Sequence, residues 1–219
     1  MIPIRDHNPS GGIPIVTYIL IAVNILVFLY MLFLPEKAID SFIDYFGLIP
    51  AQVTSGQHLV TFITSMFIHG GIGHIAGIML FLNIFGDNLE NSMGHIKYLV
   101  FYFICGFAAS FAQVFVDPSS TIPQIGASGA IAGLMGGYLV LFPRNQVDVL
   151  FSFGSYLRGG TVPAFAMLIY WFVYQLFFGA ESLTSTQDVG GVAYMAHIGG
   201  FAAGFMITNI FKKRIEGAA

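Results

Sequence analysis

Six long stretches of the 219-residue chain contain no aspartate, glutamate, lysine or arginine, and this pattern constrains the fold more than any other feature. Only 9% of the residues are charged, whereas soluble domains carry about 25%. A membrane-spanning helix needs about 20 consecutive apolar residues, and each stretch supplies about that number. The sequence therefore predicts an all-α membrane protein with six transmembrane helices. The stretches are Ile13–Leu34, Leu59–Gly86, Tyr98–Val116, Pro118–Pro143, Gly159–Ala180 and Val189–Phe211.

We expect a single membrane domain over residues 1–219, with a core at about 13–211 and short tails at 1–12 and 212–219. Six spans leave no room for a separate soluble domain. The first stretch is too long for a signal-peptide core and lacks an evident cleavage site of small residues, so we interpret it as retained. The chain has one cysteine, Cys105, and an intramolecular disulfide is therefore not possible.

The positions of the basic residues predict the orientation. If both termini lie on one side, seven of the eight lysines and arginines share that side, and only Lys37 lies opposite. By the positive-inside rule this side is cytoplasmic, so we expect both termini in the cytoplasm and the protein in the plasma (inner) membrane. The net charge of −3 is too small to indicate nucleic acid as a partner. The shared residues are Arg5, Lys97, Arg144, Arg158, Lys212, Lys213 and Arg214.

The fourth stretch carries the sequence Gly-Ala-Ser-Gly at 126–129. A proline-containing segment at 117–125 precedes it, so the helix is predicted to start near Ser128 and must stop by Pro143. Its length is about 16 residues, or roughly 24 Å, against a hydrocarbon core of about 30 Å. Irregular backbone at that depth is tolerated only when it is buried in protein or lines a wet cavity. We therefore predict a short central fourth helix with Ser128 at the floor of a water-filled pocket that opens outward.

The sixth stretch carries a single histidine, His197. If this helix starts near Gly191, His197 lies roughly 9 Å deep, which is similar to the depth of Ser128. Ionisable groups within a bilayer usually face the bundle interior and mark function. Small residues recur at every fourth position on both helices, and although membrane packing alone explains them, they also let two backbones approach closely. These residues are Gly129, Gly133 and Gly137 on the fourth helix, and Ala196, Gly200 and Gly204 on the sixth.

A serine hydroxyl becomes a useful nucleophile when a base takes its proton, and His197 is the candidate base for Ser128. No Asp or Glu occurs in the membrane-spanning parts of the last three helices, so a serine hydrolase here would use a Ser–His dyad. An oxyanion stabiliser is also required, and His74 near the start of the second span is a candidate donor. For His74 alone, an interfacial position or an interhelical hydrogen bond is an equally good interpretation.

These residues resemble the signature of the rhomboid family of intramembrane serine proteases. The likeness covers about residues 13–211 and rests on four motifs in the same order along the chain. The motifs are His-x4-His (His69, His74), Gly-x-x-x-Glu (Gly86, Glu90), Gly-x-Ser-Gly (Gly126, Ser128, Gly129) and Ala-His-x-x-Gly (Ala196, His197, Gly200).

The resemblance implies a six-helix rhomboid-type bundle whose first external loop associates with the membrane. It implies that Ser128 is the nucleophile and His197 the general base, with the Ser128 backbone N–H and His74 serving the oxyanion hole. The implied substrates are transmembrane proteins, cleaved near the extracytoplasmic face of the lipid bilayer. The fifth helix and the loop Gly179–Val192 would form the gate for these substrates. No metal and no organic cofactor is implied, and the oligomeric state is left open.

One departure from the family pattern concerns the oxyanion hole. The family usually has an asparagine four residues after the position of His74, and this chain has Ile78. Loss of one oxyanion donor typically lowers turnover by about 10²–10³-fold. We therefore predict a slower enzyme, or a different donor such as Gln124.

A second departure concerns the histidine. The family often has an aromatic residue four positions after the serine, and this chain has Ala132 there. The sequence thus leaves open what orients His197, and Tyr194 and Phe201 are the candidates.

Other classes of membrane protein are alternatives. An inactive relative acting as a scaffold or chaperone is favoured by Ile78, whereas the intact Ser128 and His197 argue against it. A transporter or channel would pair buried charges across repeats, and none is visible. A metalloprotease would carry His-Glu-x-x-His, whereas His69 and His74 enclose no glutamate. An aspartyl intramembrane protease would need two aspartates within its spans, and the spans contain none.

Overall fold

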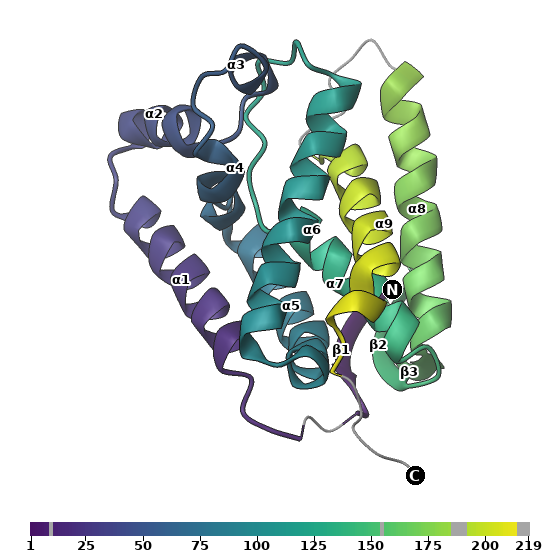
Figure 1. The fold of residues 1–219 in the computed structure, drawn as a ribbon. Coiled ribbons are helices and arrows are strands. Elements are labelled where there is room, and N and C mark those ends of the chain that lie inside the picture. The colour runs from purple at the N-terminus through teal and green to yellow at the C-terminus, as the bar shows by residue number, and fades with distance from the viewer. Residues whose placement is uncertain (9–10, 154–155, 185–191, 214–219) are drawn as a thin grey trace.

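The structure is a computed structural model that describes residues 1–8, 11–153, 156–184 and 192–213, and most of it is helical (Figure 1). The long helices run side by side, and a small sheet lies at the end of the molecule where the chain begins. The apolar helices are α1 (Ile15–Leu32), α5 (Ile72–Met93), α6 (His95–Val116), α7 (Ser128–Leu141), α8 (Ala164–Thr184) and α9 (Tyr194–Phe211).

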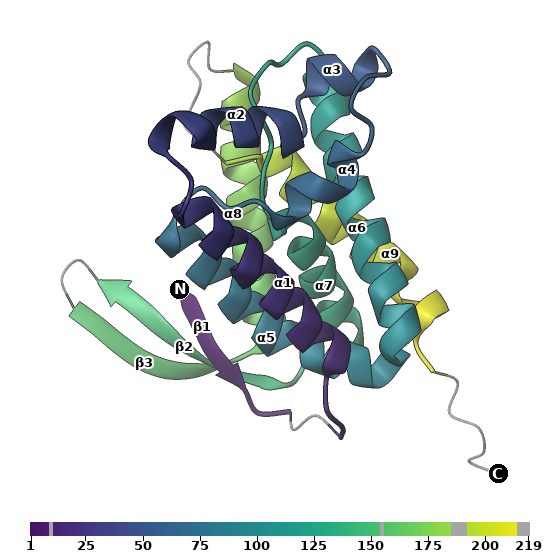
Figure 2. The same cartoon turned by 90° about the vertical axis from the view of Figure 1, so that its left-hand side faces the viewer.

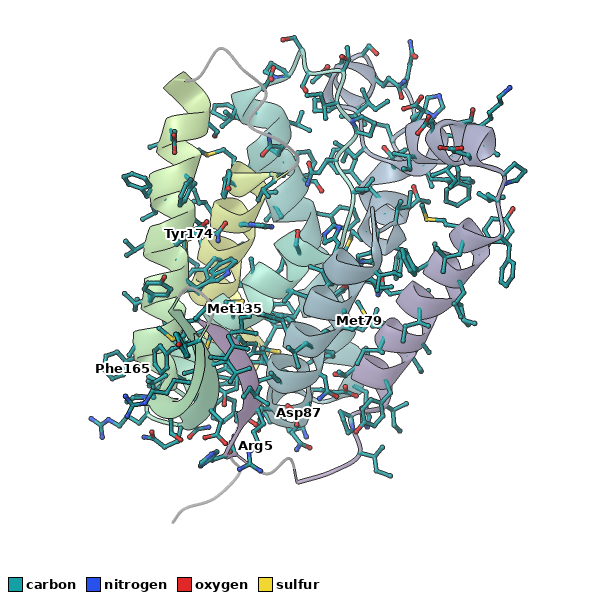
Figure 3. All side chains as sticks on the ribbon, turned by 180° about the vertical axis from the view of Figure 1, so that it is seen from behind. Arg5, Met79, Asp87, Met135, Phe165 and Tyr174 are labelled. Carbon is teal, nitrogen blue, oxygen red and sulfur yellow. The ribbon has the colours of Figure 1, made fainter. Side chains whose placement is uncertain are left out.

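Within the described part of the chain, four helices are long and apolar enough to cross a membrane. They are α1, α5, α6 and the segment Ala164–Ser182 of α8. Their outward surfaces carry large apolar side chains: on α8, Phe165 and Tyr174 are 49% and 45% exposed (Figure 3). Such exposure is costly in water and favourable against lipid.

Helix α7 is a shorter apolar helix of 14 residues at the centre of the group. It spans about 21 Å, less than the hydrocarbon core of about 30 Å. It contacts α5, α6, α8 and α9, and every residue from Gly129 to Tyr138 is buried. It begins at Ser128, as the sequence predicts, and ends at Leu141, just before Pro143.

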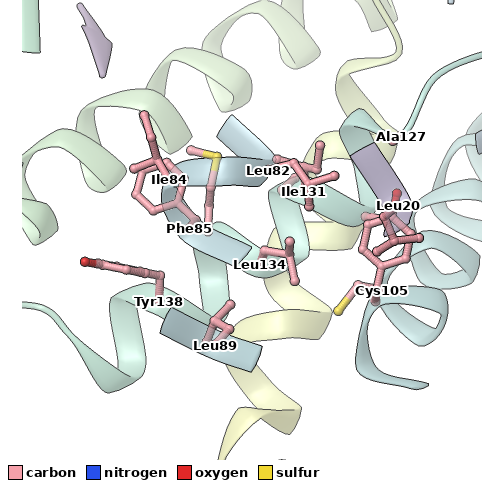
Figure 4. Close-up of a cluster of buried hydrophobic side chains, with 14 of the residues drawn as sticks. Leu20, Leu82, Ile84, Phe85, Leu89, Cys105, Ala127, Ile131, Leu134 and Tyr138 are labelled. Atoms are coloured by element: carbon pink, nitrogen blue, oxygen red, sulfur yellow. The ribbon is translucent and has the colours of Figure 1, made fainter. Parts of the chain in front are cut away.

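The interior around α7 is filled by apolar side chains from several helices (Figure 4). Leu82 and Phe85 from α5, Cys105 from α6 and Leu134 from α7 are all fully buried. Cys105 thus acts as a small packing residue.

A buried carboxylate joins the first three long helices at one end. Glu90 of α5 is 1% exposed and accepts hydrogen bonds of 2.8 Å from the backbone N–H groups of Val16 and Thr17. It also accepts a 2.7 Å bond from the Thr17 hydroxyl and lies 2.5 Å from Nδ1 of His95 at the start of α6. Glu90 therefore satisfies orphan N–H groups at the start of α1 and fixes that end against α5 and α6.

The sheet was not anticipated, and it corrects the expectation of a purely helical chain. Strand β1 (Ile2–Asp6) pairs antiparallel with β2 (Gln146–Phe153), which pairs antiparallel with β3 (Tyr156–Pro163) (Figure 2). Residues 1–12 therefore contain a strand, and the first five residues of the fifth charge-free stretch belong to β3, so that α8 begins at Ala164.

The alternation of apolar and polar residues along β2 explains why this segment forms a strand with one face on the helices. Val147 and Val149 are both fully buried against the helices, whereas Asp148 between them points to the other side. There Asp148 lies 2.7 Å from Arg5 of β1 and accepts a 2.6 Å hydrogen bond from the hydroxyl of Thr161 in β3. Arg5, Asp148 and Thr161 are paired across the three strands, so the bonds to Asp148 fix the pairing at this position. The pairing of β1 with β2 shifts by an irregularity between Pro3 and Arg5.

The segment between α1 and α5 lies at the end opposite the sheet (Figure 1). It is folded rather than extended, and it reaches the loop before α7 through a pair of main-chain hydrogen bonds of 3.0 and 2.8 Å between Leu48 and Gln124. Phe62 packs its ring against Phe111 of α6 at 4.8 Å. Its elements are α2 (Glu36–Phe46), α3 (Pro50–Thr54), α4 (Thr61–Thr64) and the 3-10 turn η1 (Ser65–Phe67).

Candidate active site

Ser128 is the first residue of α7 and is half-buried. The preceding loop reaches it through Gly126, whose φ of 108° lies in a region that favours glycine. The Gly126 N–H donates a 2.8 Å hydrogen bond to the carbonyl oxygen of Ser65, which fixes the loop against η1. The first turn of a helix has N–H groups without intrahelical acceptors, so Ser128 stands beside free backbone donors.

His197 lies in the first turn of α9, three residues after its start at Tyr194. Its Nε2 atom is 2.8 Å from the Oγ atom of Ser128. The structure thus brings together a hydroxyl and an imidazole that are 69 residues apart in the chain.

Close contact between the backbones of α7 and α9 makes this distance possible. A Cβ added to Gly200 would overlap the carbonyl oxygen of Gly129, and one added to Gly204 would overlap that of Gly133. Gly137, one turn further along α7, lies against Thr208 of α9. The small residues of both helices therefore face each other along the length of the contact.

Two residues of α8 hold the imidazole from its other side. The side-chain oxygen Oε1 of Gln175 is 2.8 Å from Nδ1 of His197. The Trp171 ring lies one helical turn away, with its centroid 5.7 Å from that of His197 and an interplanar angle of 41°. An amide oxygen only accepts, so Nδ1 carries the proton and Nε2 is free to accept from the Ser128 hydroxyl.

The sequence had pointed to other partners for this histidine. Among the described residues, the ring that pairs with His197 is Trp171; Phe201 stacks on Trp171 and Phe172 instead, and Tyr194 stacks on Phe178. A signal was available, because a glutamine four residues after a tryptophan shares its helical face. A polar side chain in an apolar span usually faces a partner inside the bundle.

His74, the third residue of α5, borders the loop that leads to Ser128. Its Nδ1 atom accepts a long hydrogen bond of 3.4 Å from the Gly70 N–H, so in the neutral ring Nε2 carries the proton. A Cβ built on Gly126 would lie 3.2 Å from this Nε2 atom. The N–H of His74 is therefore a donor next to the Gly-x-Ser-Gly loop.

His69 lies behind His74, with ring centroids 5.3 Å apart. Its side chain is buried, and burial lowers the pKa of His69 to about 4. It is therefore neutral at physiological pH and adds no charge beside His74.

The two positions considered for the oxyanion hole differ in their surroundings. Ile78 is partly buried and packs on the hydrophobic core. Gln124 pairs with Leu48 through its main chain, and its buried side-chain oxygen has no hydrogen-bond partner among the described residues. For the expected gate, α8 is described as far as Thr184, and residues 185–191 of the loop lie outside the described part.

Comparison with known proteins now adds to this geometry. The family model described as “Rhomboid domain” matches residues 56–214, which is more than half of the chain. The chain belongs to the rhomboid family. With its apolar helices, this membership makes it an integral membrane protein.

Several curated rhomboid proteins are similar to this one. RHOMBOID-like protein 4 of Arabidopsis thaliana is 29% identical over 161 residues, covering 74% of this chain and 36% of its own. Rhomboid protease GluP of Bacillus subtilis is 27% identical over 215 residues, covering 95% of this chain and 39% of its own. Inactive rhomboid protein 1 of Drosophila melanogaster is 27% identical over 96 residues, covering 43% of this chain and 7% of its own. The chain thus spans well under two thirds of the length of these relatives.

Proposed function

We propose that this rhomboid protein is a serine endopeptidase that cleaves transmembrane proteins within the bilayer, with Ser128 as nucleophile and His197 as general base. The observation that carries the proposal is the 2.8 Å contact between Ser128 Oγ and His197 Nε2. This is the hydrogen-bond distance that a general base needs from the proton it removes. The similarity to a protein named as a rhomboid protease supports it further.

The reaction follows from the positions of these atoms. The Ser128 oxygen attacks the carbonyl carbon of the scissile peptide while Nε2 of His197 takes the hydroxyl proton. The developing oxyanion is stabilised by the backbone N–H of Ser128 and by the Nε2–H of His74, with Gly126 and Gly129 shaping the approach. His197 then returns the proton to the leaving amine, and water repeats the sequence on the acyl-enzyme to release the second product and restore Ser128.

The proposal includes an arrangement in the membrane. All six apolar helices cross it as one membrane domain, with the sheet and both termini on the cytoplasmic side of the plasma membrane. The segment that contains α2 then lies on the extracytoplasmic side, and an amphipathic helix such as α2 suits the membrane surface. Ser128, at the start of the short helix α7, lies nearer that side, so cleavage occurs near the extracytoplasmic face.

A transmembrane helix hides its peptide bonds in its own hydrogen bonds, so the substrate segment must unwind before cleavage. Small or helix-breaking residues lower the cost of unwinding. We expect a single-span substrate with glycine near the scissile bond to be cleaved faster than one that is uniformly leucine there. Equal rates for the two would contradict this substrate preference.

The test of the proposal is cleavage of a single-span reporter in liposomes. The native chain should cleave it, and Ser128→Ala and His197→Ala should each abolish cleavage. A serine-directed fluorophosphonate should label the native chain and leave Ser128→Ala unlabelled. Absence of both cleavage and labelling in the native chain would overturn the protease proposal.

One observation favours a second function, that of an inactive rhomboid that binds membrane proteins as a scaffold or chaperone. Ile78 takes a position where the family usually offers an oxyanion donor, and an inactive rhomboid protein is among the relatives. The scaffold function predicts that Ser128→Ala captures the same membrane proteins as the native chain while neither cleaves them.

A further inference from the structure

Gln175 is a polar side chain buried in an apolar helix, and the proposed dyad does not require it. It is 4% exposed, and its helix α8 contains a segment with the hydropathy of a membrane span. Burial of an amide without hydrogen bonds is costly, so a glutamine at such a position needs a partner. Its Oε1 atom lies 2.8 Å from Nδ1 of His197, on the side of the ring opposite Ser128.

We propose that Gln175 is a positioning residue for catalysis, so that the site works as a Ser128–His197–Gln175 triad in which the third member is an uncharged amide. The inference rests on the proposed function and deepens it. Gln175 touches no reacting atom and acts only through the imidazole.

The first part of the role is selection of a tautomer. A neutral imidazole carries its proton on one of two nitrogens, and only the form protonated at Nδ1 presents a lone pair at Nε2 to Ser128. The amide oxygen of Gln175 accepts a proton from Nδ1 and thereby favours this form. Without it, the imidazole is free to protonate Nε2, and that tautomer cannot accept the serine proton.

The second part is orientation. One hydrogen bond leaves the ring free to turn about its axis, whereas bonds at both nitrogens fix its plane. The Trp171 ring lies beside the imidazole at an angle of 41° and limits the space in which it can turn. Trp171 shares a face of α8 with Gln175 because the two are four residues apart. The site therefore depends on three helices: α7 for the nucleophile, α9 for the base and α8 for the group that orients the base.

The chemistry explains why an amide suits this position. A carboxylate would stabilise the imidazolium formed during attack more strongly, but a buried charge within a bilayer is costly. The amide supplies the acceptor without the charge. Its oxygen still interacts with the Nδ1–H in both protonation states of His197.

The kinetic test uses Gln175→Met, which keeps the length and removes the acceptor, and Gln175→Glu, which keeps the acceptor and adds charge. In the reporter assay we expect Gln175→Met to lower kcat about 10- to 100-fold with little change in KM. This loss is smaller than the ~10²–10⁴-fold that a general base contributes, because His197 itself is still present. Gln175→Glu should recover most of that loss at high pH. Its carboxylate favours the imidazolium, so the acidic limb of the pH–rate profile should move up by about one unit or more.

A matched control is Gln113→Met. Gln113 is also a glutamine in an apolar helix, α6, and its side-chain oxygen has no hydrogen-bond partner among the described residues. This variant should keep the native kcat and pH profile. A merely structural role for Gln175 would reduce the amount of folded protein in both of its variants without moving the pH limb.

A spectroscopic measurement separates this inference from the protease proposal. ¹⁵N NMR of the imidazole, assigned by difference from His197→Gln, should report a neutral ring protonated at Nδ1 in the native chain and a shift toward the other tautomer in Gln175→Met. This readout stands even if the native chain cleaves nothing, in which case the protease proposal fails alone. An unchanged tautomer in Gln175→Met, or a Gln175→Glu variant that folds and keeps the native pH limb, would overturn the role of Gln175.

Discussion

Substitution of Gly200 by alanine tests whether the close contact of α7 and α9 sets the geometry of the site. The added Cβ would overlap the carbonyl oxygen of Gly129 and lie 3.0 Å from its carbonyl carbon. Both atoms belong to the backbone, so no side chain can move away, and restoring ordinary contact separates the helices by about 1 Å. Gly129 directly follows Ser128, and Gly200 lies less than one turn from His197. Separation of the helices at this contact therefore moves Ser128 away from His197.

The magnitudes distinguish an effect on activity from an effect on folding. Overpacking costs about 1–3 kcal/mol, but the gain in helix propensity from glycine to alanine offsets up to about 1 kcal/mol of it. In contrast, a 1 Å displacement lengthens the 2.8 Å contact between Ser128 and His197 beyond hydrogen-bonding range. Misplacement of that size lowers turnover by about 10²-fold, equivalent to about 2.7 kcal/mol.

The assay is kcat on the liposome reporter together with the rate of fluorophosphonate labelling, read beside thermal unfolding. Gly77→Ala on α5 is the matched control, because its Cβ meets no atom within 4 Å and it should leave both rates unchanged. Native turnover and labelling in a folded Gly200→Ala variant would refute the argument that backbone contact positions the dyad.

Three further predictions concern other parts of the molecule. Ile78→Asn should raise kcat, by as much as about 10²-fold if the amide reaches the oxyanion, and an unchanged kcat would indicate that another donor already serves it. Glu90→Leu leaves the buried N–H groups at the start of α1, including that of Thr17, without an acceptor, so the free energy of unfolding in detergent should fall by about 3 kcal/mol, and a loss below about 1 kcal/mol would count against this anchor. The side-chain hydrogen bond from the Thr161 hydroxyl lowers the pKa of the Asp148 carboxyl most, and the hydrogen bond from Arg5 lowers it next, so this pKa lies below its usual range. Its contribution to the sheet is therefore complete above about pH 4 and lost as the pH falls through the lowered pKa. Hydrogen exchange of the β1 amides should accelerate over that acid range in the native chain, and Asp148→Asn should remove this dependence.

The parts of the fold that sequence predicts well are those fixed by local pattern. The charge-free stretch Tyr98–Val116 lies within α6 (His95–Val116) and ends at the same residue, and α7 starts at Ser128, where the sequence predicts the start of the fourth helix. Charge-free runs, prolines and glycines determine such bounds within a few residues of chain. Depth counting along two separate helices was also enough to suggest that Ser128 and His197 meet.

The features of the fold and of the site that could not be predicted from the sequence depend on contacts between segments far apart in the chain. Strand β1 exists because residues 2–6 pair with β2, more than 140 residues further along, and no local pattern in so short a segment reveals this. The alternation of Val147 and Val149 around a polar residue was a weak signal for β2. The contact of Gln175 with His197 depends on the rotation of α8 against α9, and the sequence of α8 alone does not determine that rotation.

The unexpected sheet accounts for how so short a helix as α7 is held in register with α8. Tyr138 near the end of α7 donates a 2.5 Å hydrogen bond to Asp6 of β1, and Asn88 of α5 donates a 2.6 Å bond to the same carboxylate oxygen. The N-terminal strand thereby connects the end of α7 to α5. In the chain, β2 and β3 lead from the end of α7 to the start of α8. The N–H of Ala164, the first residue of α8, donates a 2.7 Å hydrogen bond to the carbonyl oxygen of Asn145, which precedes β2. Ser128 lies at the far end of α7 and Gln175 halfway along α8. The sheet therefore fixes α7 and α8 relative to each other at the end where it lies. The positions of Ser128 along α7 and of Gln175 along α8 follow from this, and both must match for each residue to reach His197.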